Sequence, residues 1–264
     1  NLGRVEGVRT DPQQIAILQL QRHIAPYPAG DVRAVASVDE TIANLKAATL
    51  AASKKFHADF YGTSHGEMAI VGDFDAAEVR KLVTDLLDGW KSQADYAPVI
   101  RSVQKIEVVN RMTETPDKTN AFLFAGTPLA LTQNDPDYPT LLIANQILGG
   151  DLKSRMWTRI REKDGLSYGA QTMLSAGVLE TFAPFQFYAL VNPQNTLKAE
   201  AAFKEELQKA VADGVTAQEV NEAKAAFLQE QVVGRSQDRS LAGLLANQAR
   251  YGWTMQRTAD IEAK

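Results

Sequence analysis

The order in which strand-like and helix-like patterns follow one another constrains the fold of this chain most strongly. Strand-like segments come in small groups, at residues 67–71, 102–110 and 120–126 and later at 166–175 and 182–191. Amphipathic stretches separate these groups, and three consecutive helical patterns follow over residues 196–213, 216–233 and 238–251. Strict alternation of strand and helix would predict a parallel sheet, whereas grouped strands with helices between them are typical of α+β folds. The sequence therefore predicts an α+β protein or a mixed-sheet sandwich.

Two capping boxes mark helix starts. Ser37–Glu40 and Thr216–Glu219 each place a hydroxyl residue three positions before a glutamate, so that side chains and backbone amides can cap each other. Apolar residues recur at helical spacing after the first box, which predicts one long helix that ends near Tyr61. Further helices are predicted over residues 13–23, 75–89 and 137–148.

A charged and polar stretch at residues 91–98 is the best internal boundary of the chain. We therefore expect two consecutive units, one over residues 1–98 and one over residues 99–264. The chain has no initiator methionine and ends on a helix-like phrase without a stop signal, which predicts a piece of a longer polypeptide.

The composition excludes several classes of function. The net charge is −4, so no global positive field would attract a nucleic acid or an anionic membrane. No apolar run approaches the length of about 18 residues expected of a membrane helix, and the start lacks a signal-peptide pattern. Cysteine is absent, which excludes disulfides, thiolate metal ligands and thiol nucleophiles. We expect neither a nucleic acid nor a membrane as partner.

Residues 151–169 combine a basic helix, a glycine stop and the start of a strand. Gly165 can adopt the left-handed conformation that commonly ends a helix. Arg161 lies near the end of the helix and Tyr168 lies just inside the strand, so both side chains could reach one place. An arginine can donate to a carbonyl or carboxylate and a tyrosine hydroxyl can stabilise an oxyanion, which suits acyl-transfer chemistry supplied by another group. The structural alternative is that Arg161 pairs with Glu162 or Asp164 while Tyr168 fills a sheet edge.

Metal sites have weak support in this sequence. Only three histidines are present, and neither H-E-x-x-H nor H-x-x-E-H occurs. Four potential ligands are close in sequence but are divided between a predicted helix and a loop: His57, Asp59, His65 and Glu67. Three carboxylates near a turn resemble a sparse calcium loop that lacks its other ligands, and helix capping explains them more simply: Asp73, Asp75 and Glu78.

Two glycine motifs have equally simple explanations. Gly62–Gly66 matches G-x-S-x-G and would make Ser64 a candidate hydrolase nucleophile. A nucleophile elbow joins a strand to a following helix, whereas here a helix precedes the motif and a strand is expected after it. Gly149-Gly150 could hold a phosphate at a helix start, but no Walker or G-x-G-x-x-G sequence accompanies it, and a turn between helices is the simpler interpretation.

Several phrases of the chain resemble the pitrilysin or insulinase-type zinc peptidases, also called inverzincins. The central phrases are Ile147–Gly150, Ser154–Met156 and Arg161–Tyr168, the last reading REKDGLSY. Upstream, Ala69–Asp75 and a helix to Trp90 are similar to the end of the preceding family domain. Downstream, Asp213–Glu219 followed by Lys224 is similar to the family's helix-turn-helix phrase.

The resemblance implies two consecutive α+β units with mixed, mostly antiparallel sheets packed on helices, and a zinc-free portion of such a peptidase because H-x-x-E-H is missing. It implies that Arg161 and Tyr168 bind substrate across a chamber and that zinc lies on a partner domain of the same chain or of another subunit, as in a dimer. The expected substrate is a peptide or unfolded polypeptide, and the isolated fragment is expected to be inactive. Resemblance to large bacterial members would favour the periplasm. A structural or assembly module of the same fold is the alternative, and a serine hydrolase using Ser64 is a remote one.

Overall fold

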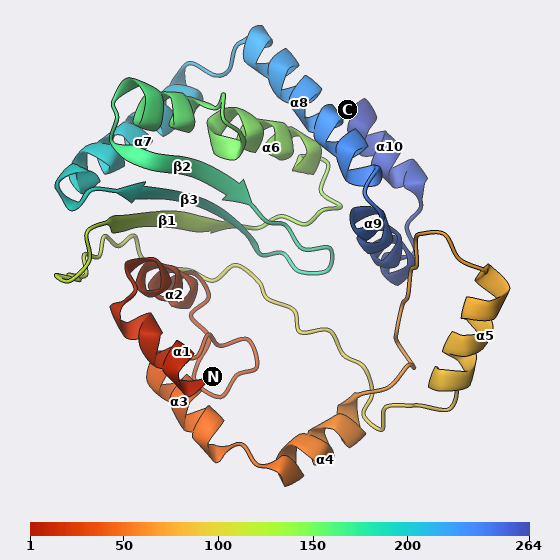
Figure 1. The fold of residues 1–264 in the computed structure, drawn as a ribbon. Helices are drawn as coiled ribbons and strands as arrows, with labels where there is room; N and C mark the ends of the chain where they lie inside the picture. Colours follow the sequence, from red (N-terminus) through yellow and green to blue (C-terminus); the bar gives the residue numbers. More distant parts are fainter. The chain divides into compact units, whose positions relative to one another are not determined.

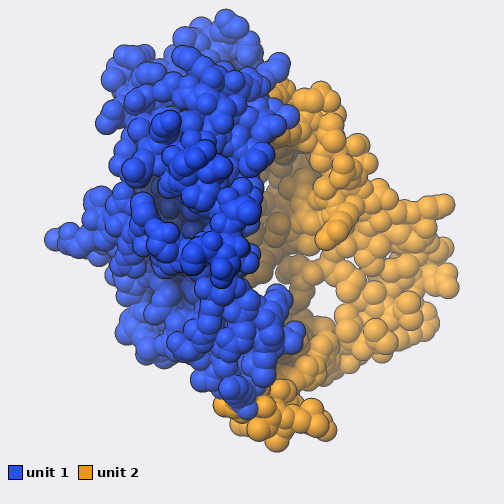
Figure 2. Space-filling view, turned by 60° about the vertical axis from the view of Figure 1, so that its left-hand side comes forward, with its two compact units in different colours: residues 1–46, 99–224 blue, residues 47–98, 225–264 orange.

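A computed structural model of the chain describes residues 1–264, which divide into two compact units. Unit 1 comprises residues 1–46 and 99–224, and unit 2 comprises residues 47–98 and 225–264 (Figure 2). The chain passes from unit 2 to unit 1 between Pro98 and Val99. The expected division into family domains at residues 1–98 and 99–264 stays a prediction, because a grouping by contacts does not test it. None of the helices is long and apolar enough to cross a membrane.

Unit 1 is an α+β unit built on an antiparallel sheet of three strands in the order β1-β3-β2. The strands are β1 (Ala121–Leu129), β2 (Ser167–Leu174) and β3 (Ala183–Val191). Figure 1 shows α6 and α7 on one side of this sheet and α2 on the other. The helical segments of unit 1 are α1 (Leu2–Gly7), η1 (Val8–Thr10), α2 (Pro12–Ile24), α3 (Val38–Ala47), α6 (Tyr138–Asn145), η2 (Gln146–Gly150), η3 (Trp157–Lys163), η4 (Pro193–Asn195), α7 (Thr196–Ala212) and the start of α8 (Ala217–Arg235).

The core of unit 1 lies between the sheet and the helices that follow β1. Alternate residues of β3 face this core, and Phe187, Ala189 and Val191 are all but inaccessible to solvent. Met156 and Ile160 pack against them, and Phe203 of α7 stacks on Phe187 with ring centroids 4.1 Å apart. Two apolar side chains four residues apart therefore fix one side of η3 to the sheet.

Unit 2 contains the helices α4 (Leu50–Phe60), α5 (Ala76–Leu87), α9 (Asp238–Tyr251), α10 (Met255–Ala263) and most of α8. The loop after α4 is tied to the end of the α5 segment, because the backbone N–H of Thr63 donates to Trp90 O at 2.8 Å. A Cβ on Gly62 would lie 2.2 Å from Ser92 N, so this close approach requires glycine. Arg235 of α8 pairs with Glu262 of α10.

Most of the helix predictions are confirmed, with one clear exception near Thr49. Both capping boxes form, with the Glu40 amide donating to Ser37 Oγ and the Glu219 amide to Thr216 Oγ1, each at 3.2 Å. The single helix expected after the first box is wrong, because α3 ends at Ala47 and α4 begins at Leu50. Thr49 is extended there, and its hydroxyl caps α4 by accepting from the Ala52 amide at 3.1 Å. Thr49, which helical spacing placed inside the helix, is therefore the N-cap at which α4 starts.

Two of the predicted strands are wrong. Residues 67–71 form no strand, and Met68 and Ile70 are largely exposed because no neighbouring strand pairs with them. Over residues 102–110 only Ser102 makes a bridge, to Thr181. Side chains of α2 and its following loop bind this segment instead: His23 contacts Glu107 O at 2.8 Å, and Tyr27 donates to Ser102 O at 3.2 Å. The strands predicted over 120–126, 166–175 and 182–191 are confirmed.

Candidate functional site

The segment that carries Arg161 is anchored at its start to the beginning of α8. Arg155 forms a two-pronged ion pair with Glu219, with Nε to Oε1 at 2.6 Å and Nη2 to Oε2 at 2.8 Å. Arg155 also donates to Gly214 O at 3.0 Å. The guanidinium and the Thr216 amide hold the pKa of the Glu219 carboxyl down at about 2. With Met156 and Ile160 in the core, these bonds fix the position from which η3 starts.

The helix in this segment is a π-helix, which the sequence pattern does not distinguish from an α-helix. Residues Trp157–Lys163 have the wide helical form that occurs frequently at functional sites. Gly165 then turns the chain with φ +60°, as its identity predicts, and the Leu166 amide donates to Ile160 O at 2.9 Å. The turn brings the chain directly from the helix end into β2.

Tyr168 is the extra residue of a β-bulge at the start of β2. Ser167 is paired with Val191 and Gly169 with Leu190, so Tyr168 has no partner on β3. The Ser167 hydroxyl lies 2.7 Å from Leu190 O and accepts from the Gly169 amide at 3.1 Å, which stabilises the irregular backbone. A bulge redirects the side chain at which it occurs, and Tyr168 is 67% exposed.

The structure places the Arg161 guanidinium against the backbone of Tyr168. Nη1 of Arg161 donates to the backbone O of Tyr168 at 2.5 Å. The structural alternative is wrong for Arg161, because Asp164 pairs with Arg159 and Glu162 accepts from the indole of Trp157. It is right that Tyr168 lies at a sheet edge, because β2 is an edge strand. Arg161 Nε and Nη2 and the Tyr168 hydroxyl have no hydrogen-bond acceptor within the chain, so these donors are available to a ligand.

Trp157 is the residue of this site that sequence reasoning missed. Its position near helical spacing with Met156 and Ile160 is typical of a core-facing residue and gives no functional signal. The guanidinium carbon of Arg161 lies 5.0 Å from the centroid of its ring, within the range of a cation–π interaction. The available signal was the separation of four residues between an aromatic and an arginine, which places them on one helix face.

The weaker metal candidates do not converge. No group of three or more His, Cys, Asp or Glu side chains is arranged to hold a metal ion. His57 stacks on Tyr61 and Trp90, and Asp59 pairs with Lys55 at 2.7 Å. Asp75 caps α5 by accepting from the Glu78 amide at 2.8 Å, as helix capping predicts.

Neither glycine motif has the geometry of the site that its sequence would predict. Ser64 follows α4 through a short loop, so the strand that a nucleophile elbow requires before the serine is missing. Gly149 packs against β2, where an added Cβ would lie 2.5 Å from Thr172 N. A Cβ added to Gly150 would lie 2.6 Å from Gln146 Oε1. Protein atoms thus fill the space that a phosphate would need at Gly149-Gly150.

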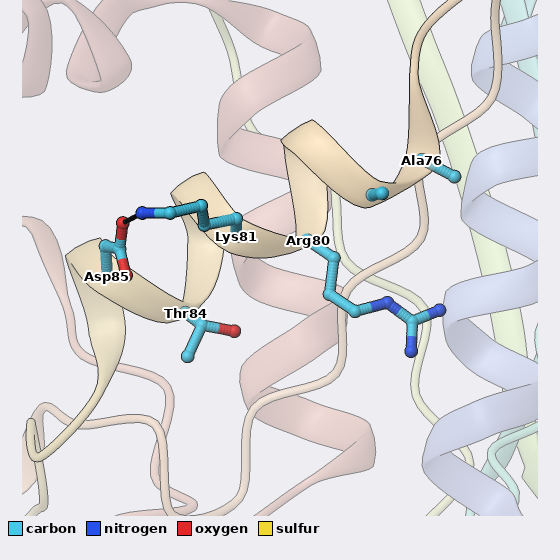
Figure 3. Close-up of a pocket in the computed structure, with 6 residues that line it drawn as sticks. Ala76, Arg80, Lys81, Thr84 and Asp85 are labelled. Atoms are coloured by element: carbon cyan, nitrogen blue, oxygen red, sulfur yellow. Dashed lines mark hydrogen bonds and ion pairs between the residues drawn. The ribbon is translucent and has the colours of Figure 1, made fainter.

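A hollow on unit 2 is lined by α5 alone, through Ala76, Ala77, Arg80, Lys81, Thr84 and Asp85 (Figure 3). Lys81 Nζ lies 2.5 Å from Asp85 Oδ2, and the Arg80 guanidinium points away from this pair. The hollow combines an ion pair whose charges are already satisfied by each other with one exposed cation, Arg80. It is therefore a weaker candidate than the corner at Arg161 and Tyr168.

Comparisons with known proteins show the family of the chain. Residues 47–227 match the model of the family described as peptidase M16 inactive domain. The chain belongs to this family. An uncharacterized zinc protease of Streptomyces coelicolor is 24% identical over 214 residues, which are 77% of this chain and 43% of that protein. This M16 chain thus spans less than half the length of its curated relative.

Solved structures share the fold of this M16 inactive domain. The M16 inactive domain of Pseudomonas fluorescens superposes with a TM-score of 0.77 at 19% identity, over 99% of this chain and 60% of the other. A chain of complex III from Candida albicans superposes with a TM-score of 0.70 at 13% identity, over 99% of this chain and 63% of the other. The family explains the α+β architecture, and no zinc-binding motif is expected in a domain of this type.

Proposed function

We propose that this M16 inactive domain lines the substrate chamber of a zinc endopeptidase and positions a peptide for hydrolysis by a zinc site on another domain or subunit. The observation that carries the proposal is that the Arg161 guanidinium contacts the backbone of Tyr168, while both side chains are exposed and keep donors that no other group of the chain binds. A π-helix and a β-bulge, two irregularities common near functional sites, present them there. If the zinc domain is on a second polypeptide, the active assembly is at least a dimer.

The free donors suit a peptide carbonyl. Negative charge develops on the carbonyl oxygen when water attacks the peptide bond, and donors fixed in advance stabilise that charge. Arg161 supplies a charged N–H and Tyr168 a neutral O–H, both acting on a peptide or unfolded polypeptide. The zinc ion, held outside this chain, would supply the activated water. Because this chain contributes donors alone, we expect it to hydrolyse no peptide by itself.

The test uses the protease assembly that contains this chain. Arg161→Ala is expected to lower kcat/KM for a peptide about 100-fold, the typical cost of one oxyanion donor, and Tyr168→Phe is expected to lower it less. Zinc content should equal that of the wild type in both variants. Unchanged kinetics in both would refute the proposal.

The fold likeness to a complex III chain supports a second candidate, a structural or assembly module. That role requires the folded surface of the domain but no free donors at Arg161 and Tyr168. Under this alternative, Arg161→Ala leaves both peptide turnover and the amount of assembled complex unchanged. Peptide turnover therefore separates the two functions, and size-exclusion chromatography of the same variants shows that any loss of turnover is not a loss of assembly.

A further inference from the structure

We propose that Trp157 is a positioning residue, which holds the Arg161 guanidinium in the orientation that meets a peptide carbonyl. This inference rests on the proposed function of Arg161. Arginine has a long side chain that loses rotamer entropy when it is fixed, so an exposed arginine needs a support to be preorganised. Arg161 is exposed, and only two groups of the chain hold its guanidinium.

The two supports act on different parts of the guanidinium. Tyr168 O accepts from Nη1 at 2.5 Å, and the Trp157 ring lies beneath the guanidinium carbon at 5.0 Å. One hydrogen bond alone would allow the group to rotate about the N–H···O direction. The aromatic face is a second contact, which restricts this rotation.

Trp157 is itself held on both sides. Its indole N–H donates to Glu162 Oε1 at 3.3 Å, which fixes the ring relative to the helix. Its Cζ3 would lie 3.9 Å from a Cβ on Gly169, an ordinary packing distance, so the ring also reaches the backbone of β2. The ring therefore connects the π-helix to the strand that carries Tyr168.

An aromatic support has a chemical advantage over a carboxylate at this position. Arg159, two residues away, contacts Asp164 through Nη1 at 3.1 Å and Glu205 through Nη2 at 3.0 Å, so the carboxylates occupy in-plane N–H groups. A ring face attracts the cation through its quadrupole and uses none of the in-plane donors. Trp157 thus orients Arg161 while leaving Nε and Nη2 free for substrate.

The test compares four variants in the zinc-containing protease assembly: Trp157→Phe, Trp157→Leu, Arg161→Ala and the Trp157→Leu/Arg161→Ala double variant. Trp157→Leu is expected to lower kcat about 3- to 10-fold with KM changed less than about twofold, because the orienting contact acts on transition-state stabilisation. Trp157→Phe keeps an aromatic face and is expected to retain most of the activity. The double variant should match Arg161→Ala, because Trp157 acts only through that residue.

Trp253→Leu is the matched control, since Arg257 lies over the Trp253 ring at 3.6 Å in unit 2, and it should keep wild-type kcat. Melting temperature is measured for every variant, and Trp157→Met replaces Trp157→Leu if the latter unfolds. Wild-type kcat in Trp157→Leu, or losses that add in the double variant, would overturn the inference. Wild-type kcat in Arg161→Ala would instead refute the proposed function, which keeps the two failures distinct.

Discussion

Replacing Glu219 with glutamine tests how firmly the segment that carries Arg161 is anchored. The carboxylate accepts two hydrogen bonds from Arg155 and one from the Thr216 amide, the last at 2.8 Å. A glutamine amide has one acceptor oxygen and no charge, so it cannot reproduce the two-pronged ion pair. The substitution should therefore destabilise unit 1 at neutral pH.

The lowered pKa of Glu219 gives an upper limit to the loss of unfolding free energy. A decrease from 4.5 to about 2 corresponds to a ceiling of about 3 kcal/mol, at about 1.4 kcal/mol per pH unit. The Arg155 and Glu219 side chains keep 18% and 29% of their exposure, so solvent screens part of this interaction. We expect Glu219→Gln to lower the free energy of unfolding by about 1–2 kcal/mol at pH 7.

Urea unfolding at two pH values checks this reasoning. The pKa is depressed in the folded state, so the stabilisation is complete above pH 4.5 and is lost as the pH falls through about 2. The difference between wild type and Glu219→Gln should therefore shrink by about half between pH 7 and pH 3. An equal difference at both pH values, or a variant as stable as the wild type at pH 7, would refute the electrostatic account.

Two further substitutions probe the fold. Gly149→Ala should destabilise the chain by about 1–3 kcal/mol in urea unfolding, because the new methyl group would overlap the Thr172 backbone. Gly243→Ala, where a Cβ meets nothing within 4 Å, is its control, and equal effects would contradict the packing argument. Thr49→Ala should remove the cap of α4 at a cost of about 1 kcal/mol, seen as faster hydrogen exchange at the Ala52 amide. Slower exchange there would mean that α3 and α4 can join into one helix.

The features that could be predicted from the sequence are those that depend on near neighbours in the chain. The capping boxes, the Asp75 cap and the Gly165 turn each involve residues no more than six positions apart. The α+β class followed from the order of such local patterns. Thr49 fits the apolar spacing of a continuous helix and is also a good N-cap residue, and in the structure it is the N-cap of α4.

The failures concern partners that are distant in sequence. Residues 67–71 and 102–110 have strand-like composition, but a strand also needs a neighbour to hydrogen-bond, and periodicity does not supply one. The bulge at Tyr168 depends on pairing with Leu190, and no sequence signal marked it. The spacing of Arg161 and Tyr168 made them candidates and the family resemblance implied a role in substrate binding, whereas the contact between them and the contribution of Trp157 required the structure.

The most direct test of the central claim compares two cations of the same helix. Arg161→Ala and Lys163→Ala each remove one positive charge from η3, and both side chains are exposed. In the zinc-containing protease assembly, kcat/KM for a peptide should fall about 100-fold in Arg161→Ala and stay within about twofold of the wild type in Lys163→Ala. Equal kinetics of the two variants, whether both are active or both impaired, would contradict a specific contribution of Arg161 to peptide hydrolysis.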